Sequence, residues 1–173
     1  MIKKINKFLR NLRLSAFPVG SVLLSILIGI LPYQSNNFSV LLPFFSLIVI
    51  YFWTIYRPYN LSYFSLLLLG FLKDVLENDV LGLNALCFIV FQAMIKSRRK
   101  YIINNSFNII WFGFALFSGL IILFYMLLVN LNNNVQFSTF SIMYNQWLIT
   151  ALVYIPLHYL LNNLQNINSS FNE

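Results

Sequence analysis

The sequence predicts an all-α integral membrane protein, built as a bundle of six transmembrane helices. Three observations favour this fold class. Apolar residues make up 60% of the 173 residues and charged residues only 9%, whereas a soluble domain has about 25% charged residues. The apolar residues form long runs separated by short polar stretches, and Lys and Arg gather on alternate stretches. Such patterns are typical of a chain that crosses a bilayer several times.

The predicted transmembrane domain covers residues 15–161, between a basic N-terminal segment (1–14) and a polar C-terminal tail (162–173). Its first span is just long enough to cross a hydrocarbon core of about 30 Å with local thinning of the bilayer. No small-residue cleavage site follows this span, so we expect it to be a retained signal anchor. The six spans are predicted at about 15–31, 38–56, 61–76, 80–95, 107–129 and 144–161.

The distribution of basic residues predicts how the bundle is oriented. Of the 11 Lys and Arg residues, all but Lys73 lie in the N-terminal segment or in the connections after the second and fourth spans. The positive-inside rule therefore places both termini in the cytoplasm and the turn between the third and fourth spans outside. The basic clusters at 3–13 and 96–100 abut apolar spans, so we expect them to contact membrane lipids and not nucleic acid.

The stretch from Arg57 to Ala85 contains the polar residues that most need an explanation. Arg57 and Pro58 are expected to end the second span, because arginine reaches the interface and proline stops a helix. Three of the four acidic residues of the chain lie within positions 74–79. Asn78 is expected to take the left-handed conformation just past a helix end, and Asp79 to cap the next helix. The sequence therefore predicts two short helices joined by a tight acidic turn.

Gly70 and Asp74 are four residues apart, so on a helix they share one face, and the glycine allows another helix to approach the carboxylate. Asp74 is interpreted either as a functional residue, through a partner contact or a buried structural contact, or as a residue that only terminates its helix. Asn84 and Gln92 share a face of the fourth span and are expected to point into the bundle.

Two stripes of small residues indicate close helix packing, since small side chains let helix backbones approach each other in lipid. The first stripe consists of Ser21, Ser25 and Gly29, and the second of Ala115 and Gly119. For the first stripe, packing inside the bundle and a surface for a partner are both open interpretations.

The sequence offers little chemistry for catalysis. His158 is the single histidine and has no carboxylate near it in sequence, and Cys87 is the single cysteine. No nucleophile motif, glycine-rich phosphate loop or metal-ligand cluster is evident. The carboxylates of the acidic turn could hold a divalent cation, but caps and a solvated face explain them as well. We therefore expect no enzymatic activity, no cofactor and no metal.

Three segments of the chain resemble the MreD family of rod shape-determining membrane proteins of bacteria. They are Tyr-Phe-Trp-Thr-Ile-Tyr-Arg-Pro at 51–58, Gly-Phe-Leu-Lys-Asp-Val-Leu at 70–76 and Leu-Gly-Leu-Asn-Ala at 81–85, which includes Gly82 and Asn84. Length and span number are also similar over essentially the whole chain. Asn78 and Val80 depart from the glycine and proline that are common in the family at these positions.

The resemblance implies a non-enzymatic scaffold of the cell-elongation machinery in the bacterial inner membrane, which helps to regulate lateral peptidoglycan synthesis. The implied partner is the bitopic periplasmic protein MreC, which crosses the membrane once, within a wider complex of MreB, RodA and its penicillin-binding transpeptidase. The family is also similar in size and span number to the small-molecule-binding subunits of vitamin importers. That alternative requires a polar or aromatic cavity at the outward end, for which Asn84 and Gln92 alone give little support.

Overall fold

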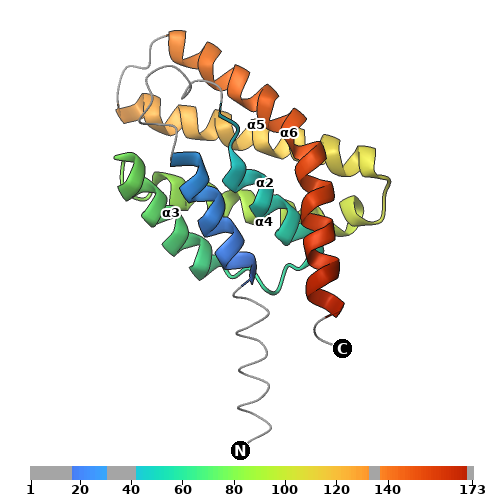
Figure 1. The fold of residues 1–173 in the computed structure, drawn as a ribbon. Coiled ribbons are helices and arrows are strands. Elements are labelled where there is room, and N and C mark those ends of the chain that lie inside the picture. The colour runs from blue at the N-terminus through green and yellow to red at the C-terminus, as the bar shows by residue number, and fades with distance from the viewer. Residues whose placement is uncertain (1–16, 31–41, 133–136, 171–173) are drawn as a thin grey trace, which may run out of the picture.

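The computed structural model describes residues 17–30, 42–132 and 137–170. These residues form helices and no strands, which confirms an all-α fold (Figure 1). The first helix, drawn in blue, is Phe17–Ile30. The helices labelled in Figure 1 are α2 (Phe45–Tyr56), α3 (Tyr63–Glu77), α4 (Leu83–Ile103), α5 (Phe107–Asn132) and α6 (Phe137–Ser170).

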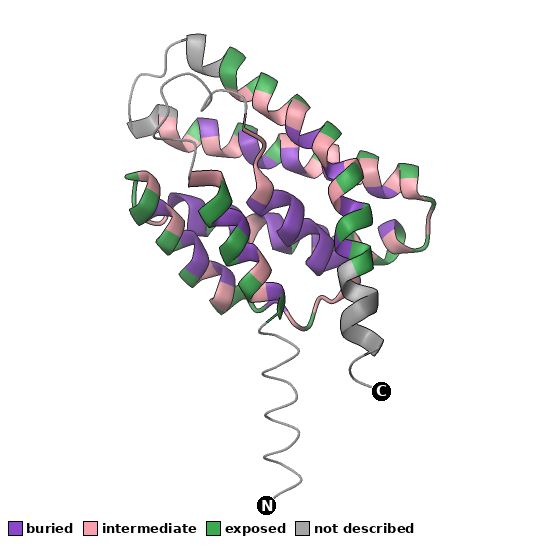
Figure 2. Ribbon diagram, viewed as in Figure 1, coloured by how far each residue is buried: buried purple, intermediate pink, exposed green. Residues whose placement is uncertain are grey.

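Helix α2 lies at the centre of the molecule, and Figure 2 shows it buried along most of its length. Its residues from Ser46 to Ile55 are all buried. The polar atoms of its large aromatic side chains find partners on the surrounding helices. The Tyr51 hydroxyl donates to the Ile110 carbonyl at 2.8 Å, and Trp53 Nε1 donates to Ser21 Oγ at 2.8 Å. These bonds remove the cost of burying unpaired polar groups and attach α2 to α5 and to the first helix.

Helices α3 and α4 form a closely packed hairpin. A Cβ atom at Gly70 would lie 2.2 Å from the Ala85 Cα and 2.6 Å from its backbone nitrogen. Only glycine permits this approach of two backbones. The contact confirms the prediction that Gly70, on the same helix face as Asp74, allows another helix to come close. Among the labelled helices, the described part of α3 packs against α4 alone. The opposite side of α3 is therefore not covered by any of α2, α5 or α6.

Several helices end at positions other than the limits predicted for the spans. Helix α2 begins at Phe45, and residues 38–41 of its predicted span lie outside the described residues. Helix α4 continues to Ile103, through the basic cluster at 96–100. Helix α6 extends from Phe137 to Ser170 and has Pro156 in its interior. Figure 1 shows α6 changing direction between its orange and red parts, as a proline inside a helix predicts.

By length and composition, one helix of the described residues is clearly able to cross a membrane. It is the segment Phe107–Val129 within α5. The helices Phe17–Ile30 and Phe45–Tyr56 are apolar but shorter.

The two predicted stripes of small residues have different surroundings. Ser21 accepts from Trp53 of α2, whereas the buried Ser25 hydroxyl donates to the Val22 carbonyl of its own helix at 2.7 Å. A Cβ at Gly29 would meet nothing within 4 Å. In the second stripe, the Ala115 carbonyl accepts from Trp147 Nε1 at 3.1 Å, and Gly119 packs against the same indole ring. The second stripe therefore packs against the side chain of Trp147 in α6 and not against a helix backbone.

Replacement of Gly70 by alanine is expected to destabilise the fold, because the new methyl group overlaps the backbone of Ala85. We expect a loss of about 1–3 kcal/mol in the free energy of unfolding, measured by denaturant titration of the purified protein in detergent. Gly20→Ala is the matched control, since a Cβ at Gly20 meets nothing within 4 Å. Alanine is better than glycine in a helix by about 1 kcal/mol, so the control should be at least as stable as the parent. Equal stabilities of the two variants would contradict the close packing of α3 on α4.

Candidate functional site: the acidic turn and the cavity beside it

The carboxylate of Asp74 connects the end of α3 to the start of α4. Asp74 is fully buried. Its Oδ2 accepts from the backbone N–H of Gly82 at 2.8 Å, and its Oδ1 accepts from the backbone N–H of Asn84 at 2.9 Å. A buried carboxylate requires such donors, because it has lost its hydration. Asp74 therefore makes a buried structural contact and is not a surface group available to a partner.

The backbone of the turn takes two left-handed conformations. Asn78 ends α3 with φ 55° and ψ 32°, as the sequence predicts. Gly82 precedes α4 with φ 93°, a region in which residues other than glycine are strained. The N–H of Asn78 and the N–H of Asp79 both bond to the Asp74 carbonyl, the latter at 3.0 Å. The carbonyl and the carboxylate of Asp74 therefore both accept hydrogen bonds from the backbone of the turn and of the start of α4.

The expectation that Asp79 caps α4 is wrong. The residue before α4 is Gly82, and Asp74 is the side chain that accepts from free amides at the start of this helix. The side chain of Asp79 points instead to neutral donors. Asn84 Nδ2 and the Tyr125 hydroxyl both donate to Asp79 Oδ2, each at 3.1 Å. Asp74, at the end of α3, therefore accepts the hydrogen bonds that Asp79 was expected to accept at the start of α4.

A second set of contacts involves Lys73, one residue before Asp74. Its ammonium group donates to Glu77 Oε2 at 2.6 Å and to Asn84 Oδ1 at 3.0 Å. Asn84 is 5% exposed, so its amide bridges Lys73 and Asp79 within the bundle. These contacts extend from α3 through α4 to Tyr125 of α5. Neither Lys73 nor Tyr125 is among the site residues predicted from the sequence, since nothing in the local sequence indicates this long-range pairing.

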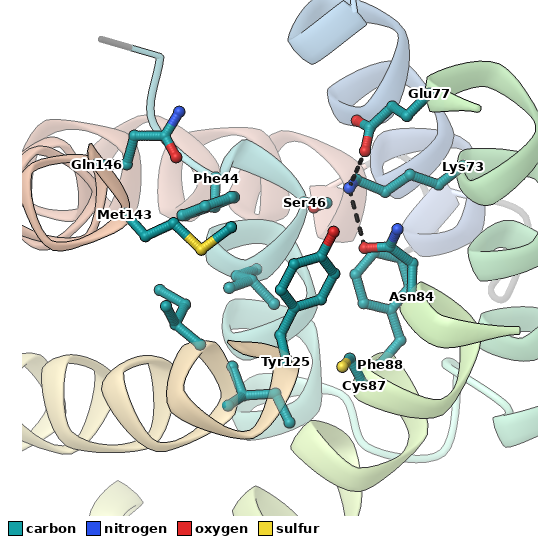
Figure 3. A pocket seen from close by; sticks show the side chains of 13 residues that line it. Phe44, Ser46, Lys73, Glu77, Asn84, Cys87, Phe88, Tyr125, Met143 and Gln146 are labelled. Atoms are coloured by element: carbon teal, nitrogen blue, oxygen red, sulfur yellow. Dashed lines mark hydrogen bonds and ion pairs between the residues drawn. The ribbon is translucent and has the colours of Figure 1, made fainter. Parts of the chain in front are cut away.

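A cavity with two chambers lies beside this network. Figure 3 shows the side chains that line the first, apolar chamber. The apolar chamber has a volume of about 100 Å³ and is bordered by Leu47, Cys87, Phe88 and Ile121. The polar chamber has a volume of about 250 Å³. Its lining includes Ser25, Gly29, Ser46, Lys73, Glu77, Asp79, Tyr125 and Gln146. Both chambers share a wall that contains Lys73, Glu77 and Tyr125, and Figure 3 shows the ends of these side chains directed toward the same space.

The other predicted site residues lie away from the cavity. The backbone N–H of Arg57 bonds to the Trp53 carbonyl at the end of α2, and Pro58 follows in the next turn. Gln92 is fully buried, as expected, and donates to the Leu61 carbonyl at 2.8 Å. His158 lies within hydrogen-bonding reach of Tyr154 and Tyr56, at 3.2 and 3.5 Å. Within the described residues, no group of three His, Cys, Asp or Glu is arranged to hold a metal ion.

Comparison with known proteins shows that residues 10–164 match the family model of the rod shape-determining protein MreD. The chain belongs to the MreD family. It is also 29% identical over 129 residues to an uncharacterized protein, RP566, of Rickettsia prowazekii (strain Madrid E). This similarity covers 75% of the chain and 73% of the relative. No solved structure matches the chain.

Membership of the MreD family gives this chain a role in rod shape determination as a membrane-associated protein. The matched residues include the whole acidic turn and all the residues named above as lining the cavity. The geometry of both features therefore belongs to the part of the chain that defines it as an MreD protein.

Replacement of Asp74 by asparagine is expected to destabilise the turn. The amide has a single acceptor oxygen, so its NH₂ group must face one of the two backbone N–H groups that the carboxylate now accepts. We expect a loss of about 1–3 kcal/mol in the free energy of unfolding. Glu77→Gln is the control, because a partly exposed ion pair between residues i and i+4 contributes only about 0.3–0.5 kcal/mol. The free energies of unfolding of both variants are measured in detergent. If Asp74→Asn is as stable as the parent protein, the carboxylate does not hold the turn in place.

Proposed function

We propose that this MreD protein is a non-enzymatic scaffold of the cell-elongation machinery in the bacterial inner membrane. In this proposal, six transmembrane helices hold an outward-facing acidic turn, and both termini lie in the cytoplasm. The protein pairs with MreC and acts with MreB, RodA and its penicillin-binding transpeptidase to regulate lateral peptidoglycan synthesis. The family match over residues 10–164 supports the role in cell shape.

The single observation that best supports a scaffold is the open side of α3. This helix packs against α4 alone among the labelled helices. Its uncovered side exposes Phe64 (67%), Leu68 (53%) and Val75 (63%). These residues recur at helical spacing, so they form one apolar stripe along the helix. A transmembrane helix of MreC could pack along this stripe.

The acidic turn supplies the end of the same surface. Leu81 is 67% exposed and Val80 47% exposed, although both follow directly on a turn held by a buried carboxylate. Exposed apolar side chains at a rigid turn are suitable anchors for a partner, because little side-chain and backbone freedom is left to lose on binding. Asp74 contributes to this proposed surface only by holding the turn in place.

The importer alternative receives support from one feature, the cavity described above. An importer subunit needs such a cavity at its outward end. The family match favours the scaffold, and a scaffold can also contain a ligand site. Retention of a vitamin through purification would favour the alternative.

The proposed topology predicts the accessibility of two exposed positions. In a Cys87→Ser background, a cysteine at Val80 should react with a membrane-impermeant maleimide in intact spheroplasts. A cysteine at Ser97 should react only after the membrane is permeabilised. The opposite pattern, or equal labelling at both positions in intact spheroplasts, would contradict the six-span arrangement.

The proposed MreC surface predicts the effect of a polar substitution at the turn. Leu81→Gln should reduce the recovery of MreC with the purified protein by about tenfold, since loss of one buried leucine contact is worth about 1.5 kcal/mol or more. Leu127→Gln is the matched control, because Leu127 of α5 is 64% exposed and lies toward the same end of the bundle. Recovery is measured from solubilised membranes and normalised to the amount of this protein. Equal recovery of MreC with both variants would remove the turn from the contact.

A further inference from the structure

The polar chamber contains an excess of negative charge. Its charged lining residues are Lys73, Glu77 and Asp79. Lys73 is paired with Glu77, with side-chain exposures of 13% and 26%. Among the described residues, Asp79 is contacted by the neutral donors Asn84 and Tyr125 but forms no ion pair. One carboxylate of the chamber therefore has no cation of its own.

Within the part of the chain that the structure describes, Lys73 is the one basic residue that lines either chamber. The turn 78–82 itself contains no Lys, Arg or His. The nearest basic side chain in the sequence is Lys73, whose charge is already shared with Glu77. A partly buried carboxylate gains most from a cation that is also shielded from water. A ligand that carries a positive charge would therefore complement this chamber.

The lining and the volume of the apolar chamber restrict which ligand can bind. It adjoins the polar chamber at Lys73, Glu77 and Tyr125, and its other walls are mostly apolar. Its volume of about 100 Å³ is of the order of an engineered apolar cavity of about 150 Å³ that binds benzene. A small apolar group therefore fits beside the polar chamber.

We propose that this cavity binds an amphiphilic primary amine, with its ammonium group against Asp79 and its apolar group between Phe88 and Ile121. The ammonium donates to the Asp79 oxygen that accepts from neither Asn84 nor Tyr125. Glu77 lies on the shared wall and is paired with Lys73, so Asp79 supplies the net negative charge of the chamber. A primary ammonium group occurs both in a free arylalkylamine and in the ethanolamine headgroup of a phospholipid. This proposal does not rest on the proposed contact with MreC.

The test uses three probes of the same size and shape that differ in charge: 2-phenylethylamine, 2-phenylethanol and phenylacetate. The full-length protein is placed in nanodiscs of phosphatidylglycerol. Cys87 lines the apolar chamber and is the single cysteine of the chain, so its modification by methyl methanethiosulfonate reports occupancy without any substitution. The rate of modification, followed by intact-protein mass spectrometry at increasing probe concentration, gives the affinity of each probe.

The amine is expected to protect Cys87 at a concentration about tenfold lower than the alcohol, because a hydrogen bond to a charged group contributes about 1.5 kcal/mol or more. Phenylacetate should protect least. Asp79→Asn keeps an oxygen that can accept from Asn84 and Tyr125, and it should abolish the preference for the amine while leaving protection by the alcohol unchanged. The matched control is Glu173→Gln, which removes a carboxylate from the C-terminal tail and should retain the preference.

Two further outcomes identify the source of the amine or overturn the proposal. Protection of Cys87 in nanodiscs that contain phosphatidylethanolamine, without any added probe, would support the lipid headgroup as the natural ligand. Protection by the free amine alone would support a soluble ligand. Equal affinity for the three probes, absence of protection by any of them, or an unchanged preference in a stably folded Asp79→Asn variant would overturn the proposal.

Discussion

The pair of hydrogen bonds that Asp74 accepts from the N–H groups of Gly82 and Asn84 is the interaction on which the rest of the site depends. The carboxylate is fully buried, so its desolvation is offset only if these donors are in place. Their position requires the left-handed backbone of Asn78 and Gly82. One turn earlier, the contact of Gly70 with Ala85 sets the distance between the same two helices. Packing and hydrogen bonding therefore specify one arrangement of α3 and α4.

The cavity follows from this arrangement. By fixing the start of α4, Asp74 positions Asn84, whose amide bonds both Lys73 and Asp79. Asp79 in turn accepts from Tyr125 of α5. The side of the polar chamber that contains Lys73, Asp79 and Tyr125 is thus formed by residues linked to the turn. A change at the turn that moves α4 would alter the exposed surface around Leu81 and the chamber together. This gives the proposed partner surface and the proposed ligand site a common structural basis.

The sequence predicted the features that depend on local chemistry. Composition predicted an all-α fold, asparagine predicted the left-handed end of α3, and the spacing of Gly70 and Asp74 predicted a close helix pair. The cap of α4 was predicted wrongly, because an acceptor from the previous helix competes with Asp79 for the free amides. The contact between Asp79 and Tyr125 spans 46 positions, and no local pattern indicates it. Helix α4 begins at Leu83, after the predicted start at 80, but continues past its predicted end, and α6 extends beyond both predicted limits. A helix can continue beyond the apolar residues that cross a bilayer.

The most direct measurement of the central interaction is amide hydrogen exchange of the turn, followed by NMR on the protein in lipid nanodiscs. The structure places the amides of Gly82 and Asn84 on the buried Asp74 carboxylate, whereas no described residue accepts from the amide of Leu81. The amides of Gly82 and Asn84 are therefore expected to exchange more slowly than that of Leu81 by about tenfold or more, after correction for intrinsic rates. Exchange of all three amides at the same corrected rate would contradict it.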